Sequence, residues 1–84
     1  MKPSKNIRWK DLILYQDDYY TIISKPAGLS TLEDRASDTD VLKLARQDNP
    51  LATPCHRLDK ETSGVLVVAN HEEAYRYFAQ KLEH

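Results

Sequence analysis

The hydrophobic positions of the chain fall into five runs, and their spacing predicts three strands and two helices. Residues 12–15 and 19–24 are rich in β-branched, aromatic and aliphatic side chains and flank a short polar break, which is the pattern of a hairpin. Residues 65–69 are apolar at every position, which predicts a central strand covered on both faces. The predicted order is strand, strand, helix, strand, helix, without an internal repeat.

The two predicted helices have recognisable start and stop signals. An apolar stripe over residues 41–45 follows Asp38-Thr39-Asp40, which offers a side-chain cap, and Asn49-Pro50 stops the helix. The second helix follows Asn70, which has the spacing of a capping box with Glu73. Its predicted apolar face consists of Ala74, Tyr75, Phe78 and Leu82.

The remaining segments are polar connections. Residues 1–11 carry no sustained period, and we interpret them as an N-terminal arm with Trp9 as an anchor. Residues 25–28 must leave the strand, because Pro26 has no N–H for a ladder and Gly28 permits φ values closed to other residues. Residues 54–58 are predicted to be an extended approach to a polar turn at residues 59–64.

Composition limits the chain to one small globular unit, or to a piece of a larger one. It has 84 residues, of which 40% are hydrophobic and 30% charged, so it is neither disordered nor repetitive. No apolar run approaches the roughly 20 residues of a membrane span, and the start lacks the apolar stretch of a signal peptide. We therefore expect a soluble, cytoplasmic protein with no membrane partner. Cys55 is the only cysteine, which excludes an internal disulfide and a multi-cysteine metal site.

The net charge is only weak evidence against a nucleic-acid partner. At −1, the chain lacks the long-range attraction to phosphate of a strongly basic domain, although a local cluster of Lys and Arg could still bind RNA. The last three residues, Leu82-Glu83-His84, are either native or the start of an expression tag.

Ionisable and hydroxyl groups are concentrated in residues 56–64, between two apolar stretches. If the chain stays extended there, Arg57 and Asp59 emerge on one face and His56 and Leu58 on the other. A guanidinium beside Asp59 would keep that carboxylate ionised, as a nucleophile or a base requires. The plainer alternative is a turn aspartate beside a surface arginine.

Residues 56–69 closely resemble the catalytic motif of the RluA-type pseudouridine synthases. In that motif His-Arg-Leu-Asp precedes a Thr-Ser-Gly turn and an apolar strand. Residues 22–29, Ile-Ile-Ser-Lys-Pro-Ala-Gly-Leu, resemble the other N-terminal motif of the family, a strand that ends in Lys-Pro-x-Gly-Leu. The resemblance implies that residues 12–84 are the N-terminal part of a catalytic domain. The implied fold class is α+β, with a largely antiparallel mixed sheet and flanking helices.

The resemblance also implies a reaction on uridine in ribosomal or transfer RNA. The N1–C1′ glycosidic bond breaks, the uracil turns in place, and C5 joins C1′. Asp59 is then the catalytic aspartate, acting either by attack at C1′ or by removal of a ribose proton. A base inside an RNA helix must be flipped out to be reached. No metal and no organic cofactor is implied.

Four further residues are candidates for RNA binding or support. Arg57 could fill the vacated stack or hold a phosphate, or it could form a structural salt bridge. His56 could contact RNA, whereas Cys55-His56 alone is no metal site, because a closed zinc site needs about four ligands. Lys60 and Arg35 either add local positive charge or are ordinary solvated side chains. Lys25 either binds a phosphate or ends a strand in solvent, and we favour a structural role for its turn.

Later motifs of the family have no counterpart in these residues. Those motifs supply a tyrosine that packs on the target base, a role that we transfer neither to Tyr75 nor to Tyr77. We therefore expect the 84 residues alone to be inactive and, because a face or sheet edge is uncovered, either to self-associate or to be marginally stable. The competing hypothesis is a non-catalytic RNA-binding or assembly module that keeps the fold.

Overall fold

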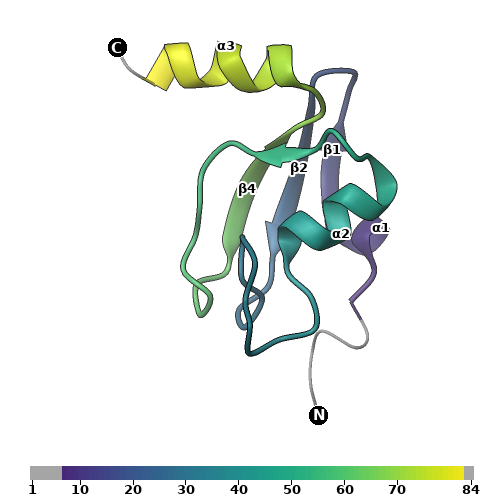
Figure 1. Cartoon of the computed structure of the whole chain (residues 1–84), viewed down its shortest axis with the longest axis vertical. Coiled ribbons are helices and arrows are strands. Elements are labelled where there is room, and N and C mark those ends of the chain that lie inside the picture. The colour runs from purple at the N-terminus through teal and green to yellow at the C-terminus, as the bar shows by residue number, and fades with distance from the viewer. Residues whose placement is uncertain (1–6, 83–84) are drawn as a thin grey trace.

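A computed structural model of the chain describes residues 7–82 (Figure 1). The elements in chain order are α1 (Trp9–Leu12), β1 (Ile13–Gln16), β2 (Tyr20–Lys25), α2 (Val41–Asp48), β3 (Thr53–Pro54), β4 (Gly64–Ala69) and α3 (Glu72–Leu82). The predicted α+β class is confirmed.

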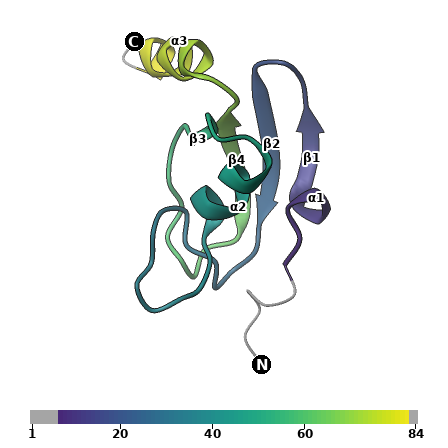
Figure 2. The same ribbon diagram turned by 45° about the vertical axis from the view of Figure 1, so that its right-hand side comes forward.

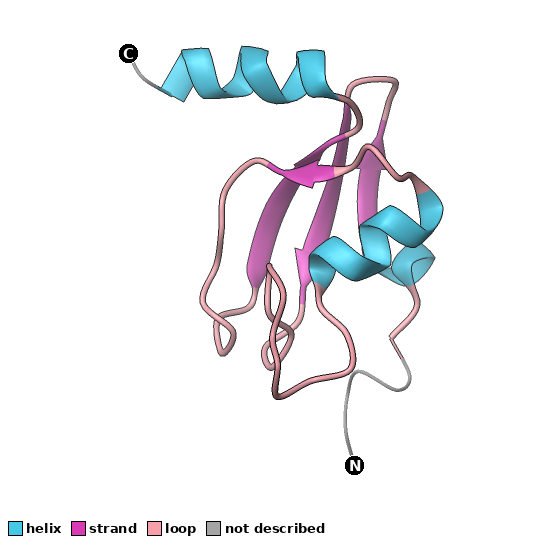
Figure 3. Ribbon diagram, in the orientation of Figure 1, coloured by secondary structure: helices cyan, strands magenta, loops and turns pink. Residues whose placement is uncertain are grey.

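The four strands form one antiparallel sheet in the order β1-β2-β4-β3. In the register of the two long strands, Ile23 lies opposite Leu66 and Lys25 lies opposite Gly64. Helices α1 and α2 lie on one face of this sheet (Figure 2). Helix α3 crosses one end of the sheet and projects beyond it (Figure 3).

The core lies between the sheet and α2. Alternate residues of β2 and β4 point into it, so that Ile23, Leu66 and Val68 are fully buried against Val41 and Leu44 of α2. The other face is more open, because Val65 is 58% exposed and Val67 is only partly buried. The prediction that both faces of this strand are covered was therefore wrong for its outer face.

Helix α2 starts and stops where the sequence predicts. Asp40 is its cap, with a carboxylate oxygen that accepts from the backbone N–H of Lys43 at 2.7 Å. The helix ends before Asn49. Three of the four predicted stripe residues are buried, whereas Leu42 is half-buried.

The start of α3 differs from the prediction. Its first turn is capped by Nδ1 of His71, which accepts from the N–H of Ala74 at 3.2 Å. Asn70 instead joins the β1–β2 hairpin to β4, donating to the carbonyl of Asp17 and accepting from the hydroxyl of Thr21. Of the predicted apolar face, Ala74 is buried and Phe78 half-buried, but Tyr75 and Leu82 are exposed.

Two short elements were not predicted. Strand β3 is only two residues long. Helix α1 is a single turn that begins in the segment expected to be an arm and includes Leu12, which was predicted to start the first strand. Trp9 packs against the core. Residues 1–6 and 83–84 lie outside the described part of the chain, and with them most of the arm and of the suspected tag. Within the described part, no helix has the length and apolar character that crossing a membrane requires.

Candidate active site

Two loops meet at the end of the sheet that lies away from α3 (Figures 1 and 2). One follows β2 and starts with residues 26–29, and the other, residues 59–63, precedes β4. The backbone N–H of Gly28 donates to the carbonyl of Lys60 at 2.7 Å. Gly28 has a φ of 92°, a conformation that other residues rarely adopt. The two segments that resemble family motifs are thus in direct contact.

Lys25 is the second link between the loops. Its side chain is fully buried, and its ammonium group donates to the carbonyl oxygens of Pro26, Leu29 and Lys60 at 3.0, 2.6 and 3.1 Å. Burial lowers the pKa of Lys25, while the nearby charges of Glu61 and Asp59 act in the opposite direction. Lys25 therefore does not end its strand in solvent, and its three donors are engaged by backbone carbonyls.

An ion pair adds a third link. Nζ of Lys60 lies 2.9 Å from Oδ2 of Asp34, which also accepts from the hydroxyl of Ser30. Lys60, the N–H of Ala36 and Ser30 together hold the pKa of Asp34 below its usual value. Part of the positive charge expected from Lys60 is therefore compensated within the protein.

Asp59 lies in this junction with its side chain exposed. Its carbonyl accepts from the N–H of Thr62 at 2.9 Å, which closes a turn over residues 59–62. Arg57 is also exposed, whereas His56 and Leu58 are partly buried, and this matches the predicted alternation. Within residues 7–82, Arg57 and Asp59 form no ion pair with one another. Both side chains are thus presented to solvent.

His56 continues the β3–β4 ladder with its side chain. The N–H of Cys55 donates to the carbonyl of Val67, and the N–H of Val67 donates in turn to Nε2 of His56 at 3.2 Å. The imidazole also stacks on Phe78 of α3, with ring centroids 6.4 Å apart. This geometry makes His56 a support for the strand that leads to Asp59.

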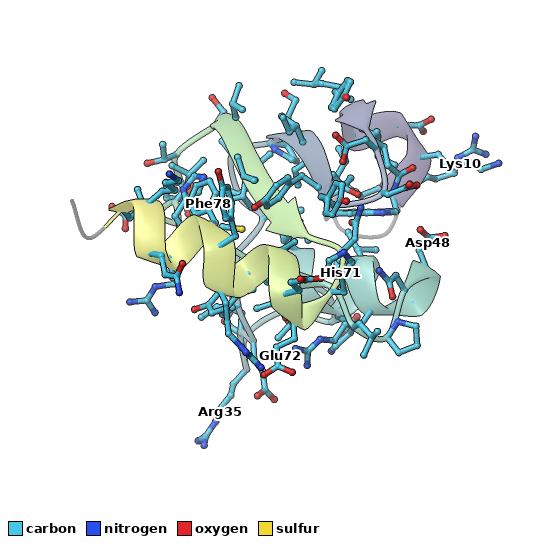
Figure 4. The ribbon with its side chains drawn as sticks, turned by 90° about the horizontal axis from the view of Figure 1, so that it is seen from above. Lys10, Arg35, Asp48, His71, Glu72 and Phe78 are labelled. Atoms are coloured by element: carbon cyan, nitrogen blue, oxygen red, sulfur yellow. The ribbon has the colours of Figure 1, made fainter. Side chains whose placement is uncertain are left out.

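A shallow hollow of about 410 Å³ lies beside Arg57. Arg46 and Tyr75 line it together with Leu32 and His56. Arg46 donates from Nε to the carbonyl of Ala52 at 2.9 Å, which fixes its position. Arg35, by contrast, extends away from the body of the molecule (Figure 4).

The described residues hold no group of three or more His, Cys, Asp or Glu side chains arranged to bind a metal ion. Burial raises the pKa of the Cys55 thiol to about 11, so the thiol is protonated at neutral pH. Asp59 presents an exposed carboxylate on a turn that backbone hydrogen bonds hold in place.

The sequence profile of the RNA pseudouridylate synthase family matches residues 19–84. The chain belongs to this family. The dual-specificity RNA pseudouridine synthase RluA of Escherichia coli K12 is 42% identical over 67 residues, which cover 77% of this chain and 31% of the relative. The ribosomal large subunit pseudouridine synthase C of Buchnera aphidicola is 32% identical over 80 residues, covering 92% of this chain and 25% of the relative.

A solved structure supports the same pseudouridylate synthase fold. Human RNA pseudouridylate synthase domain containing 4 superposes with a TM-score of 0.69 at 28% identity, over 88% of this chain and 30% of that one. The predicted resemblance to the RluA-type enzymes is thus confirmed. The chain spans about a third or less of the length of the relatives it matches.

The sequence patterns did not single out two residues that hold the site together. Asp34 and Thr31 lie in a polar loop without period, where nothing distinguishes a hydrogen-bonding partner from a solvated side chain. The only available signal is their position, a few residues after the Lys-Pro-x-Gly-Leu segment.

Proposed function

We propose that the protein isomerises uridine to pseudouridine in RNA, with Asp59 as the catalytic aspartate. The observation that carries the proposal is the junction at Asp59. The Lys25–Leu29 turn and the residues after Asp59 are joined through the carbonyl of Lys60, and the Asp59 side chain stays exposed. Because the chain belongs to the RNA pseudouridylate synthase family, we assign the chemistry of that family to this junction.

An exposed carboxylate on a fixed turn suits chemistry at a ribose C1′. Breaking the N1–C1′ bond develops positive charge on the sugar, and a carboxylate next to that carbon stabilises the charge. Asp59 either attacks C1′, forming a bond that breaks again when C5 of the turned uracil bonds to C1′, or removes a ribose proton that returns in that step. C5 then loses its proton and the released N1 gains one, so that the product is an isomer of uridine. The target nucleotide must leave its stack to reach Asp59.

The neighbouring residues are given supporting roles in this proposal. Arg57, exposed two residues before Asp59, contacts the RNA by filling the vacated stack or by binding a phosphate. Lys60 adds a cation next to Asp59, while Lys25 and His56 hold the backbone. The names of the relatives point to ribosomal RNA and to a dual-specificity enzyme as precedents for the substrate.

A non-catalytic RNA-binding or assembly module is the alternative. The observation that favours it is coverage, because the chain spans only 31% and 25% of the two curated relatives. An RNA-binding role would need the exposed Arg57 but not the carboxylate of Asp59.

Replacing Asp59 by Asn in the intact gene separates the two functions. Pseudouridine is mapped across cellular RNA from the wild type, a deletion strain, the Asp59→Asn strain and an Asp18→Asn strain, whose exposed aspartate lies in the β1–β2 turn. If the protein is the enzyme, the same pseudouridines should be missing in the deletion strain and in the Asp59→Asn strain, while the Asp59→Asn protein still binds RNA. Turnover by purified Asp59→Asn within about tenfold of wild type, a loss of only ~1.4 kcal/mol, contradicts a catalytic role.

A further inference from the structure

The hydroxyl of Thr31 holds the backbone directly before Asp59. Its Oγ1 donates to the carbonyl of Leu58 at 3.0 Å and accepts from the N–H of the same residue at 3.1 Å. Thr31 is only 2% exposed. Both hydrogen-bonding groups of the Leu58 backbone are therefore satisfied by one buried side chain.

Leu58 has no regular partner strand to rely on. Strand β3 ends at Pro54 and β4 begins at Gly64, so residues 57–59 lie outside the sheet ladder. A buried or half-buried backbone group that loses its partner costs more than the bond itself contributes. The conformation of this stretch therefore depends on Thr31 and on the packing of the Leu58 side chain against the core.

These bonds act directly on the orientation of Asp59. The carbonyl of Leu58 belongs to the same planar peptide unit as the nitrogen of Asp59. On its other side, the carbonyl of Asp59 is held by the N–H of Thr62. With both flanking peptide planes fixed, the direction in which the Asp59 side chain leaves the backbone is fixed as well.

Thr31 is itself attached to the most regular part of the fold. Its carbonyl accepts from the N–H of Leu42 at 3.0 Å, and the carbonyl of Ser30 accepts from the N–H of Val41 at 2.8 Å. These donors belong to the first turn of α2, whose buried side chains form part of the core. The contact thus connects the turn at Asp59 to a packed helix.

We propose that Thr31 is a positioning residue for Asp59, a role that rests on the proposed function. It acts through the backbone of Leu58 and touches no substrate. The reaction requires reacting atoms to be placed closely, and small displacements of a catalytic group reduce turnover strongly. Thr31→Val keeps the shape of the side chain and removes both hydrogen bonds, whereas Thr31→Ser keeps both.

The chain offers a matched control in Thr21. Thr21 is also 2% exposed, and its hydroxyl likewise donates to Oδ1 of Asn70 and accepts from Nε2 of Gln16. It lies in β2 among contacts to the hairpin. Thr21→Val therefore reproduces the loss of a buried hydroxyl without touching Leu58.

The first measurement is amide hydrogen exchange on the 84-residue chain. Thr31→Val should speed exchange at the Leu58 amide by about tenfold or more, while Thr31→Ser stays near wild type and Thr21→Val leaves Leu58 unchanged. An unchanged Leu58 amide in Thr31→Val, or equal acceleration in Thr21→Val, would overturn the proposal.

The second measurement is turnover by the protein from the intact gene. Thr31→Val should lower kcat by about tenfold or more with KM for RNA within twofold, and Thr31→Ser should restore kcat. Wild-type kcat in Thr31→Val overturns the proposal, as does an equal fall in Thr21→Val. If Asp59→Asn is as active as wild type, the proposed function fails instead. The exchange rate at Leu58 does not depend on activity and therefore tests the hydrogen bonds of Thr31 separately.

Discussion

The buried ammonium group of Lys25 and the backbone carbonyl of Lys60 are joined by a hydrogen bond of 3.1 Å. The same carbonyl accepts from the N–H of Gly28 at 2.7 Å. A lysine at the end of β2 thereby stabilises the turn that presents Asp59, while its own charge stays buried.

Lys25→Met should destabilise the fold by about 2–3 kcal/mol, because it leaves carbonyl groups without a charged donor in a buried setting. The measurement is the free energy of unfolding in urea. Lys43→Met is the matched control, since Lys43 is exposed and donates to the single carbonyl of Asp38. We expect that control to change stability by less than about 0.5 kcal/mol. Equal stability of Lys25→Met and wild type would show that the buried bonds contribute nothing.

Acidification should weaken the Asp34–Lys60 contact in a defined direction. The folded protein holds the pKa of Asp34 below 3.8, chiefly through Lys60, so the carboxylate stabilises the fold fully above 3.8. That contribution is lost as the pH falls through the lowered, folded-state pKa. Urea unfolding should therefore show a constant difference in unfolding free energy between wild type and Asp34→Asn at about pH 5–7. This difference should shrink in stronger acid.

A second variant tests the cause of this Asp34 effect. In a Lys60→Met background, the pH-dependent part of the difference should become smaller, because the largest cause of the pKa shift is gone. A difference that widens on acidification would contradict the assigned direction.

A single change on β4 should distinguish its two faces. Leu66→Asp places a charge in the core, where Leu66 is fully buried, and should cost at least about 4 kcal/mol and unfold the domain. The adjacent Val65→Asp places the same charge on the open face, where Val65 is 58% exposed, and should cost no more than about 1 kcal/mol. Thermal unfolding followed by circular dichroism reads out both. Similar melting temperatures for the two variants would contradict the assignment of the faces.

This difference between the faces also shows where sequence patterns lose information. The apolar run at residues 65–69 correctly predicts a strand inside the sheet, but apolar character does not reveal which side is covered. Helix α2 could be predicted closely because its cap and its stop are local signals at Asp40 and Asn49. Strand β3 could not, since two residues carry no period.

The site was predictable to a similar degree. The alternation that exposes Arg57 and Asp59 follows from an extended backbone, and the structure has it. The burial of Lys25 does not follow from any pattern, because lysine is rarely fully buried unless it is paired. Its partners are carbonyl oxygens from two loops, and one of these oxygens belongs to Lys60, 35 residues away in the sequence. Every residue has a backbone carbonyl, so the sequence does not reveal which carbonyls bind Lys25.

Cys55, the single cysteine of the chain, should react slowly with alkylating reagents. The raised pKa of about 11, against an ordinary 9.0, reduces the thiolate fraction at pH 8. Because the thiolate is the reacting species, but a more basic thiolate is also more nucleophilic, alkylation by iodoacetamide should be about tenfold slower than for the chain unfolded in urea. Mass spectrometry follows the one modified site directly. Equal rates in the folded and unfolded chain would mean that the thiol is not shielded.

The 84 residues alone should form no pseudouridine and should self-associate. The outer face of the sheet and α3 border an apolar groove of about 470 Å³, and its rim exposes Tyr15 by 55% and Leu82 by 64%. The matched regions make up only 31% and 25% of the two curated relatives, and an uncovered apolar surface favours association between copies. With a net charge of −1, few phosphates can be neutralised, so RNA binding should be weak and only mildly dependent on salt.

Sedimentation, an RNA titration and a direct pseudouridine assay on the same preparation test these expectations for the isolated chain. Tyr15→Lys combined with Leu82→Lys should reduce association while leaving the melting temperature nearly unchanged, because both side chains line the groove and are more than half exposed. The matched control is Tyr19→Lys, which is equally exposed at 55% but does not line the groove. Efficient product formation by a monomeric 84-residue chain would show that these residues already contain a complete catalytic site, since neither an uncovered face nor a near-neutral charge would then limit activity.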